Sequence, residues 1–494
     1  MKFGTWMQAA GITHWQGTFD TEVAQLACDS REIQPGWAFA ALPGEQVNGL
    51  DYVGSAIARG AVAVLATHPV ALPEGLAFGI LASDRTREHL AEAARALYGE
   101  PDAALALIGV TGTNGKTTTT MLIRQLLQGL GLGCGLIGTV TIAAGTEEIE
   151  AVRTSPESPV FYRWLRKAVD AGDVVVATEV SSHALSMARV HGAHFRVGLF
   201  TNLTQDHLDY HGTMEAYFEA KCRLFAQSER VLVNLDDAYG QRLAASGSLS
   251  TYAVDRPADY RATTVRLSPT GTCFELQSPK GSWSVASPLL GRFNLYNLLA
   301  ALAACAEAGF DLAELLQAVP GLKGAPGRLD RVDCGQPFGV MVDYAHTPDA
   351  LEKLLAAGKD LLPAGGRLHV LFGCGGDRDC SKRPLMAAAV AAGADVIWHS
   401  SDNTRTENPE NILDDAAVGI PSEILADPAR YHRITDRALA VQAALADCRT
   451  GDLLLLAGKG HEPYQDIQGV KHPYSDRRAV EAALRGETVA RPWA

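Results

Sequence analysis

The segment Gly109–Thr120, GVTGTNGKTTTT, constrains the fold of this chain more than any other stretch. It follows the apolar run ALALIGV, which predicts a buried strand, and its last residues open a helix. Backbone N–H groups in a glycine-rich turn between a strand and a helix point inward, and the start of the helix adds positive potential for phosphate oxygens. The segment therefore predicts a phosphate loop inside an α/β fold.

Two side chains of this loop have the chemistry that a nucleotide needs. Lys116 can reach β- and γ-phosphates, and the Thr117 hydroxyl can ligate Mg²⁺. The usual G-x-x-x-x-G-K spacing is not met, because Val110 stands six positions before Lys116. A purely structural glycine turn is the alternative. Since switches, transporters and kinases all use phosphate loops, the loop alone does not identify a reaction.

Apolar runs separated by helical lengths recur along the rest of the chain. After the loop they are DVVVATEV, VGLFTNL and RVLVNLDD, and later FGVMVDYA, GRLHVLFG, ADVIWHSS and GDLLLLAG. Such runs predict parallel sheets with helices on both faces. The alternating stretch near residues 256–291 suggests an antiparallel patch. With glycine and proline signals near residues 99–101 and 320–327, we predict three α/β domains at residues 1–98, 99–327 and 328–494.

Composition excludes several classes of protein. The formal net charge of −13 and the lack of a basic run argue against nucleic-acid binding. The nine cysteines are scattered without a C-x-x-C pair, so neither a disulfide framework nor a zinc site is expected, and a reducing cytoplasm is the natural location. No run approaches the roughly 20 apolar residues of a membrane span, and no signal peptide is evident.

A series of further segments occurs in the order known from one family of enzymes. They are DSR (29–31), GTNGKTT (112–118), TEVSSHAL (178–185), TNLTQDHLDYHG (201–212), YFEAKCRLF (217–225), GRFNLYN (291–297), PGRLD (326–330), DYAHTPDAL (343–351), GCGGDRD (373–379), DNTRTENP (402–409) and GKGHE (458–462). On these segments the chain resembles the Mur ligases over nearly its whole length. The resemblance implies a small α/β UDP-binding N-terminal domain, a central P-loop ATPase-like domain with a parallel sheet, and a Rossmann-like C-terminal domain.

The resemblance also implies a reaction. The expected enzyme is an ATP-dependent acid–amino-acid ligase that adds meso-2,6-diaminopimelate to UDP-N-acetylmuramoyl-L-alanyl-D-glutamate during cytoplasmic peptidoglycan precursor synthesis. A carboxylate carbon is a poor electrophile, so phosphoryl transfer from ATP must first make an acyl phosphate, which the amine then attacks. ATP and Mg²⁺ are the expected cofactors. The expected partners are these substrates, without nucleic acid or a membrane span, and a monomer is compatible with the sequence.

Four side chains are implied as the catalytic set, namely Lys116, Glu179, His207 and Lys221. By resemblance, Thr117 and Glu179 bind Mg²⁺ at the phosphates, His207 binds a second metal, and Lys221 carries CO₂ as a carbamate that can also ligate metal. From the residues alone, Glu179 is a strand-end acid and Lys221 an exposed helix lysine. Carbamylation needs a neutral amine, so the site would have to lower the pKa of Lys221.

The same resemblance implies three sets of binding residues. For ATP they are Gly112, Thr113, Asn114, Gly115, Lys116, Thr117, Thr118, Asn294, Asn297, Arg328 and Asp343. For the UDP-linked dipeptide they are Ser30, Glu45, Gln46, Val47, Thr154, Ser155, Ser181 and Arg189. Asn294 could instead cap a helix, and the DSR segment could be a local turn. Arg328 and Asp343 would reach the nucleotide after hinge closure.

The third set is expected to bind diaminopimelate: Arg378, Asp402, Asn403, Thr404, Arg405, Gly458 and Glu462. Arg405 can pair with the second carboxylate, which L-lysine lacks. Thr404 stands where the family motif has proline, which predicts a looser turn before Arg405. The alternatives are a lysine-adding ligase of the same family, a folylpolyglutamate synthetase-like ligase, and a nucleotide-gated binding protein without ligase chemistry.

Overall fold

The computed structural model describes residues 1–44, 48–268, 271–489 and 491–493. The chain divides into two compact units. The first comprises Met1–Thr264, Phe274–Val285 and Tyr296–Leu322, and the second comprises Val265–Cys273, Ala286–Leu295 and Lys323–Ala494.

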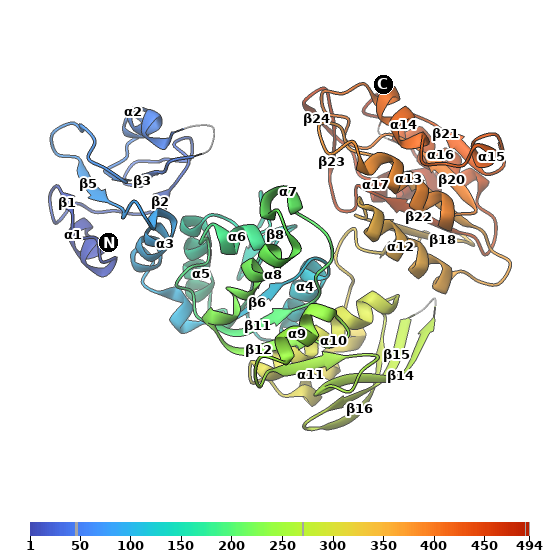
Figure 1. Cartoon of the computed structure of the whole chain (residues 1–494), viewed down its shortest axis with the longest axis horizontal. Helices are drawn as coiled ribbons and strands as arrows, with labels where there is room; N and C mark the ends of the chain where they lie inside the picture. The colour runs from blue at the N-terminus through green and yellow to red at the C-terminus, as the bar shows by residue number, and fades with distance from the viewer. Residues whose placement is uncertain (45–47, 269–270, 490, 494) are drawn as a thin grey trace. The chain divides into compact units, whose positions relative to one another are not determined.

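The first unit begins with a small five-stranded sheet in the order β1-β5-β4-β3-β2 (Figure 1). Its strands are β1 (Trp15–Gln16), β2 (Leu26–Ala27), β3 (Ala38–Ala41), β4 (Ala63–Ala66) and β5 (Ala77–Ile80), with helices α1 (Phe3–Ala9), α2 (Val53–Ala58) and α3 (Thr86–Leu97). β2 to β5 are parallel, and β1 is antiparallel to β5. Val64 and Leu65 of β4 belong to different buried clusters, so both faces of the sheet are covered.

The phosphate loop follows β6 (Ala106–Thr111) near the middle of an eleven-stranded sheet. Its order is β16-β15-β14-β13-β12-β11-β6-β10-β7-β8-β9. β10 (Val175–Glu179) and β11 (Phe195–Phe200) flank β6 in parallel, with Glu179 opposite Val110 and Phe200 opposite Thr111. The carboxyl ends of three strands therefore meet at one edge, where ligands gather in such sheets.

The remaining strands of this sheet are β7 (Cys134–Ile137), β8 (Thr141–Ala144), β9 (Glu147–Glu150), β12 (Ser228–Asn234), β13 (Ser250–Ala253), β14 (Tyr260–Ser268), β15 (Gly271–Ser278) and β16 (Gly281–Ser287). The α-helices of this region are α4 (Lys116–Gly129), α5 (Ser158–Ala171), α6 (Ser182–Ser186), α7 (Leu208–His211), α8 (Met214–Cys222), α9 (Ala238–Ala244), α10 (Arg292–Glu307) and α11 (Leu312–Ala318). The sheet is not purely parallel, because β8 pairs antiparallel with both β7 and β9. Short antiparallel hairpins of this kind carry no long apolar run, so no sequence pattern indicated them.

The second unit contains a six-stranded sheet in the order β17-β18-β22-β19-β20-β21. The strands are β17 (Asp330–Arg331), β18 (Gly339–Asp343), β19 (Leu368–Phe372), β20 (Val396–His399), β21 (Tyr431–Arg433) and β22 (Leu453–Ala457), followed by the hairpin β23 (Tyr464–Ile467) and β24 (Val470–Pro473). The α-helices are α12 (Pro348–Leu361), α13 (Lys382–Gly393), α14 (Pro409–Ala417), α15 (Ser422–Leu425), α16 (Arg437–Asp447) and α17 (Asp476–Leu484). All neighbours from β18 to β21 are parallel, whereas β17 is antiparallel to β18.

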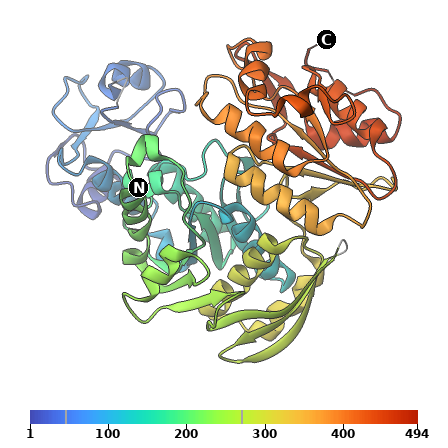
Figure 2. The ribbon, with the colours of Figure 1, turned by 45° about the vertical axis from the view of Figure 1, so that its right-hand side comes forward.

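β22 shows why this sequence makes a three-layer unit. Leu453 and Leu455 join the cluster that includes α12 and α13, whereas Leu454 and Leu456 join the cluster that includes α16 and α17. Figure 2 shows the helices of this orange-to-red part on both sides of its strands. A strand buried on both faces must be apolar throughout, as its sequence LLLLA is.

The α/β class expected from the sequence is thus confirmed, together with each of the apolar strands named above. The three domain boundaries stay a prediction, because the contact pattern yields two units. Among the described residues, no helix has the length and apolar character needed to cross a membrane.

Candidate functional site

The phosphate loop adopts the strand–turn–helix geometry that its sequence predicted. Gly112 has a φ of 144°, and Gly115, with a φ of 89°, precedes the first turn of α4. A Cβ on Gly112 would lie 1.9 Å from Thr201 Oγ1, and a Cβ on Gly115 would lie 2.6 Å from Asn297 Oδ1. Both positions therefore need glycine for conformation and for space.

A segment that the sequence did not single out as a binding element braces this loop. Thr113 N donates to the Asn202 carbonyl at 2.8 Å, and Asn114 N donates to Asn202 Oδ1 at 3.0 Å. Thr201 Oγ1 donates to the Asn114 carbonyl at 2.7 Å. These residues directly follow β11, and their place in the family motif TNLTQDHLDYHG was the available signal. They fix the predicted ATP-binding residues Thr113 and Asn114.

Two lysine ammonium groups converge on one oxygen of the loop. Lys116 Nζ lies 2.9 Å from the Gly112 carbonyl oxygen, and Lys221 Nζ lies 2.8 Å from the same atom. Lys221 is 1% exposed, so it is no solvated helix lysine. Burial, followed by the nearby Lys116 ammonium, holds the pKa of Lys221 well below its ordinary value. A buried lysine of lowered pKa is the form that can react with CO₂.

The Glu179 carboxylate links the start of α4, at Thr117, to Thr139. Thr117 Oγ1 donates to its Oε2 at 3.0 Å, while the backbone N–H of Thr139 donates to Oε1 at 2.7 Å. Glu179 is 1% exposed, so it is not a strand-end acid facing solvent. Thr139, which the sequence analysis did not identify, also donates from Oγ1 to Oε2 at 3.0 Å. Thr117 and Glu179 are thus adjacent oxygen donors of the kind that Mg²⁺ prefers.

His207 lies beyond the same edge, near other rings. Its side chain is 47% exposed, and its ring centroid lies 4.9 Å from that of His183 and 6.1 Å from that of Tyr217. Burial lowers the pKa of His207; the Asp206 carboxylate opposes this shift, while the two lysine ammonium groups add to it. A neutral imidazole is the form that binds metal.

The described part of the chain holds no group of three or more His, Cys, Asp or Glu side chains close enough to bind a metal ion by themselves. The donor set fits Mg²⁺ nevertheless, because this ion is usually held by one or two carboxylates together with substrate phosphates. Thr117 and Glu179 would supply the protein's share. A carbamate on Lys221 would add a further oxygen donor.

Residues predicted to hold the UDP-linked dipeptide surround the backbone of Glu179. Ser155 Oγ donates to the Glu179 carbonyl at 2.8 Å and lies 3.3 Å from Ser181 Oγ. Thr154 Oγ1 lies 3.1 Å from Thr139 Oγ1. Arg189 donates to the Ser155 carbonyl at 3.0 Å. The structure therefore brings these four predicted residues together, next to the predicted metal ligand.

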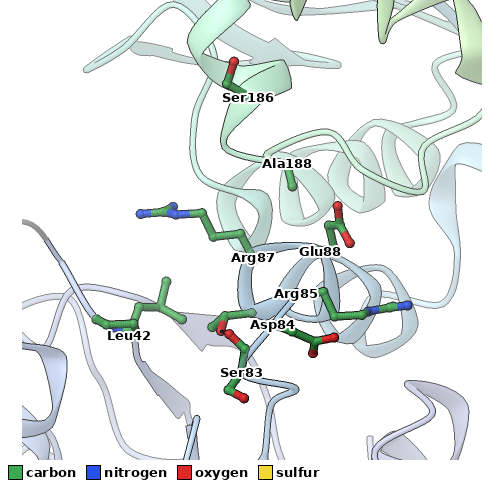
Figure 3. A pocket seen from close by; sticks show the side chains of 10 residues that line it. Leu42, Ser83, Asp84, Arg85, Arg87, Glu88, Ser186 and Ala188 are labelled. Carbon is green, nitrogen blue, oxygen red and sulfur yellow. Dashed lines mark hydrogen bonds between the residues drawn. The ribbon is translucent and has the colours of Figure 1, made fainter. Parts of the chain in front are cut away.

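A cavity of about 300 Å³ lies within the first unit, lined in part by Ala188, the residue before Arg189 in the sequence. Figure 3 shows that Ser186 and Ala188 line it from one side, and that Leu42, Ser83, Arg85 and Arg87 line it from the N-terminal region. Arg87 also approaches Glu157 at 3.2 Å, and Glu157 pairs with Arg189 at 2.8 Å. Arg85 and Arg87 carry no motif in the sequence, because they lie at the start of an ordinary amphipathic helix.

The remaining residues predicted to bind the UDP-linked dipeptide are Ser30, Glu45, Gln46 and Val47. Ser30 is buried within a turn in which Arg31 N donates to Asp29 Oδ1 at 2.9 Å, so the DSR segment does form the local turn considered above. Glu45, Gln46 and Val47 lie outside the described residues.

Of the two asparagines predicted to bind ATP, Asn297 lies against the phosphate loop. Thr119 Oγ1 donates to its Oδ1 at 3.4 Å. Asn294 Nδ2 instead donates to the Leu290 carbonyl at 2.9 Å, which gives it a local structural bond. In the second unit, the Arg328 guanidinium lies 4.7 Å from the ring centroid of Tyr344. Asp343 accepts from the Leu329 and Ala345 N–H groups at 2.7 and 2.8 Å.

The predicted amino-acid site consists of three loops that follow strands of the second unit. They are residues 373–379 after β19, residues 402–405 after β20, and residues 458–462 after β22. A Cβ on Gly375 would lie 3.1 Å from Arg405 Nη1 and 3.8 Å from Arg378 Cγ. Arg405 therefore approaches the first loop near Arg378, which belongs to that loop. A Cβ on Gly458 would lie 2.4 Å from Asp402 Oδ2. All three predicted segments therefore meet.

Arg405 is held from both its backbone and its side chain. Its φ is 50°, its N–H donates to the Asp466 carbonyl at 3.0 Å, and its Nη1 donates to the Gly376 carbonyl at 2.6 Å. Thr404, 1% exposed, accepts at its carbonyl from Glu407 N. Hydrogen bonds thus restrain the turn at the position where the family motif has proline, and the looser turn expected from threonine stays a prediction.

Two buried cations support these loops, and the sequence analysis had identified neither. Arg383, 2% exposed, donates to the Gly375 carbonyl at 3.2 Å and to Glu407 at 2.7 Å. Lys459, 0% exposed, donates to Asn403 Oδ1 and to Glu462 Oε2, each at 2.9 Å. Burial alone would raise the pKa of Asp402, but the Lys459 and Arg437 cations hold it below its ordinary value.

Comparison with known proteins supports one family throughout. Family profiles match for the Mur ligase family, catalytic domain (residues 22–99), the Mur ligase middle domain (110–305) and the Mur ligase, glutamate ligase domain (327–460). The UDP-N-acetylmuramoyl-L-alanyl-D-glutamate--2,6-diaminopimelate ligase of Geobacillus kaustophilus is 44% identical, covering 94% of this chain and 95% of the relative. The ligase of the same name from Synechococcus elongatus is 45% identical, covering 94% of each chain.

Solved structures agree with this result. One of a UDP-N-acetylmuramoyl-L-alanyl-D-glutamate--2,6-diaminopimelate ligase is 34% identical with a TM-score of 0.68, covering 98% of this chain and 99% of its own. A folylpolyglutamate synthase from Mycobacterium tuberculosis, 17% identical with a TM-score of 0.60, covers 82% of this chain and 96% of its own, and shares the fold alone. With three matching profiles and full-length relatives above 40% identity, this chain belongs to the Mur ligase family.

Proposed function

We propose that this enzyme is the ATP-dependent ligase that adds meso-2,6-diaminopimelate to UDP-N-acetylmuramoyl-L-alanyl-D-glutamate, a step of cytoplasmic peptidoglycan precursor synthesis. The observation that carries the proposal is the edge formed by β6, β10 and β11. There the phosphate loop, the Thr117–Glu179 oxygen pair and the predicted dipeptide contacts Ser155 and Ser181 adjoin one another. The names of the full-length relatives support the same substrates.

Different residues of the chain would bind the two substrates of the first step, the formation of the acyl phosphate. Lys116, with the loop N–H groups, would bind the β- and γ-phosphates of ATP. Ser155, Ser181 and Arg189 would hold the dipeptide so that its carboxylate faces the γ-phosphate. Thr117 and Glu179 would hold Mg²⁺, which would supply charge neutralisation at the phosphates. Phosphoryl transfer from ATP to the dipeptide carboxylate would then yield the acyl phosphate and release ADP.

We assign Lys221 a carbamate. Its neutral amine would attack CO₂, forming an N–C bond as one C=O π bond opens; the amine proton passes to solvent, so that a buried neutral amine becomes a buried anion. The lowered pKa of Lys221 and its place beside Lys116 support this assignment, because an anion there would pair with the Lys116 ammonium. With His207, the carbamate would hold the second metal.

In the second unit, Arg405 and Arg378 would bind the distal carboxylate of diaminopimelate, and Glu462 its ammonium group. A site built around a cation for that carboxylate rejects L-lysine, which leaves the guanidinium without its partner. Arg328 and Asp343 are proposed as further nucleotide contacts. Residues 1–98, 99–327 and 328–494 are proposed as the functional domains.

One assay tests the reaction and its specificity together. Phosphate release is measured with ATP and Mg²⁺ while the UDP-dipeptide and a panel of amino acids are supplied singly and in pairs, and the product masses are recorded. Release that requires both the UDP-dipeptide and diaminopimelate is the expected result. Phosphate release that depends on neither the UDP-dipeptide nor the amino acid would refute the ligase proposal. A preference for L-lysine would refute only the proposed specificity for diaminopimelate.

A further inference from the structure

Lys459 is a fully buried cation inside the proposed amino-acid site, at a position to which the proposed function gives no role. Its Nζ donates to Asn403 Oδ1 and Glu462 Oε2 at 2.9 Å each, and lies 3.7 Å from Asp402 Oδ1. With 0% of its side chain exposed, it cannot touch a ligand itself. Any effect on the amino acid must therefore pass through Asn403 and Glu462.

The bonds around Lys459 leave one oxygen of Glu462 unused. Glu462 Oε2 accepts from both Lys459 Nζ and Asn403 Nδ2, the latter at 2.8 Å. Among the described residues, Oε1 receives no hydrogen bond, although the side chain is 18% exposed. Two donors on one oxygen fix the plane of the carboxylate, so Oε1 is the atom offered to a ligand donor.

Asn403 is fixed in the same way. Its Oδ1 accepts from Lys459 Nζ and from the Asp466 N–H, each at 2.9 Å, and its amide therefore cannot flip without losing both bonds. The Asp466 carbonyl also accepts from Arg405 N. Lys459 thereby ties the loop that carries Arg405 to the loop that carries Glu462.

The charges point to a cationic ligand group. The buried cations Lys459 and Arg437 face Asp402, Asp476 and Glu462; Arg437 pairs with Asp476 at 2.6 Å, and Lys459 lies near Asp402 and Glu462. Three carboxylates against two cations leave one negative charge in this cluster, and Glu462 has the most exposed side chain of the three, at 18% against 10% for Asp402 and 0% for Asp476. An ammonium group of the ligand would complete the balance.

We propose that Lys459 is the positioning residue of the amino-acid site: it aims Glu462 Oε1 at the ligand ammonium and locks the relative placement of Glu462 and Asn403. The proposal rests on the proposed function, since it assumes that the diamino acid binds at these loops. Lys459 acts before any chemistry, so its loss is expected to weaken amino-acid binding selectively.

The test compares Lys459→Met with Lys471→Met in steady-state assays that vary each of the three substrates. Lys471 is exposed and lies 4.1 Å from the ring centroid of Tyr464, the ring that Lys459 approaches from 5.8 Å. Lys459→Met should raise KM for diaminopimelate at least tenfold and leave KM for ATP and the UDP-dipeptide within twofold. Lys471→Met should leave all three within twofold.

A double variant separates positioning from general support of the fold. If Lys459 acts through Glu462, Lys459→Met/Glu462→Gln should show the same KM for diaminopimelate as Glu462→Gln within twofold. The proposal would be overturned if the increases in KM for diaminopimelate caused by the two single substitutions multiplied in the double variant. It would also be overturned if Lys459→Met raised KM equally for all three substrates. If Lys459→Met fails to fold, Lys459→Gln takes its place under the same criteria, because a neutral amide lacks the charge that holds the Glu462 carboxylate. A wild type that ignores diaminopimelate would instead refute the proposed function.

Discussion

The Lys116 side chain provides the sharpest test at the scale of single residues. Lys116→Ala removes the cation aimed at the β- and γ-phosphates, so turnover should fall by at least a thousandfold while the thermal unfolding curve stays cooperative. Lys167→Ala, at a lysine that pairs with Glu147 on the surface, is the matched control and should keep its activity. Near wild-type turnover by Lys116→Ala would show that the phosphate-loop assignment is wrong.

Lys221 should make activity depend on dissolved CO₂. The amine is neutral above its lowered folded-state pKa and becomes protonated as the pH falls through that value, so the carbamate is lost on the acidic side. Added bicarbonate should shift the acidic limb of the pH–rate profile to lower pH. Lys221→Ala should be nearly inactive, with partial recovery in a short carboxylic acid. An unmodified amine in crystals grown with metal and substrates would contradict the carbamate.

Arg405 should control the choice between diaminopimelate and L-lysine. Arg405→Ala removes the partner of the distal carboxylate and should raise KM for diaminopimelate by a factor of at least ten, because a charged hydrogen bond contributes about 1.5–3 kcal/mol. KM for ATP should not change. Arg478→Ala, at an exposed arginine of α17, serves as the control. Equal losses for diaminopimelate and ATP would mean that Arg405 supports the fold instead.

At the scale of elements, the glycine-rich loop 373–379 leaves no room for added atoms. A Cβ on Gly376 would lie 2.0 Å from the Thr404 carbonyl oxygen, so Gly376→Ala must displace the loop that carries Arg405. KM for diaminopimelate should rise more than fivefold, and the melting temperature should fall. Gly247→Ala, where an added Cβ would contact nothing within 4 Å, should change neither quantity. An unchanged KM in Gly376→Ala would show that the two loops move independently.

The sequence predicted the strands better than it predicted the residues whose hydrogen bonds hold the site in place. Strands such as β6, β10 and β22 are apolar runs, so their burial on both faces was readable. Family motifs pointed to candidate residues at their ends, and position within a motif was also the available signal for Asn202 and Lys459. Thr139 and Arg383 lie outside every motif, and each acts by a bond to a residue distant in sequence. An isolated threonine or arginine carries no signal of such a bond. On composition alone, Lys221 was expected to be an exposed helix lysine. It is buried, and its Nζ donates to the carbonyl of Gly112, a residue distant in sequence.

At the scale of the whole molecule, nucleotide should stabilise the folded chain through Mg²⁺. A ligand at one hundred times its Kd adds about 2.7 kcal/mol to the free energy of unfolding. ADP with Mg²⁺ should therefore raise the melting temperature by several degrees, and a chelator should reverse most of the rise. Lys116→Ala should remove it. A rise that the chelator leaves intact would contradict the proposed role of Thr117 and Glu179 in holding the ion.

The register of β18 against β22 has an evolutionary consequence. Asp343 lies directly opposite Ala457, and Gly458 follows at once, so a proposed nucleotide contact and a proposed amino-acid contact emerge from neighbouring strand ends. An insertion or deletion in either strand would disturb both ligands together, and selection would remove it. Descendants of such an enzyme can acquire a new amino acid most readily by exchanging the side chains at Arg378, Arg405 and Glu462, while the backbone beneath them stays unchanged.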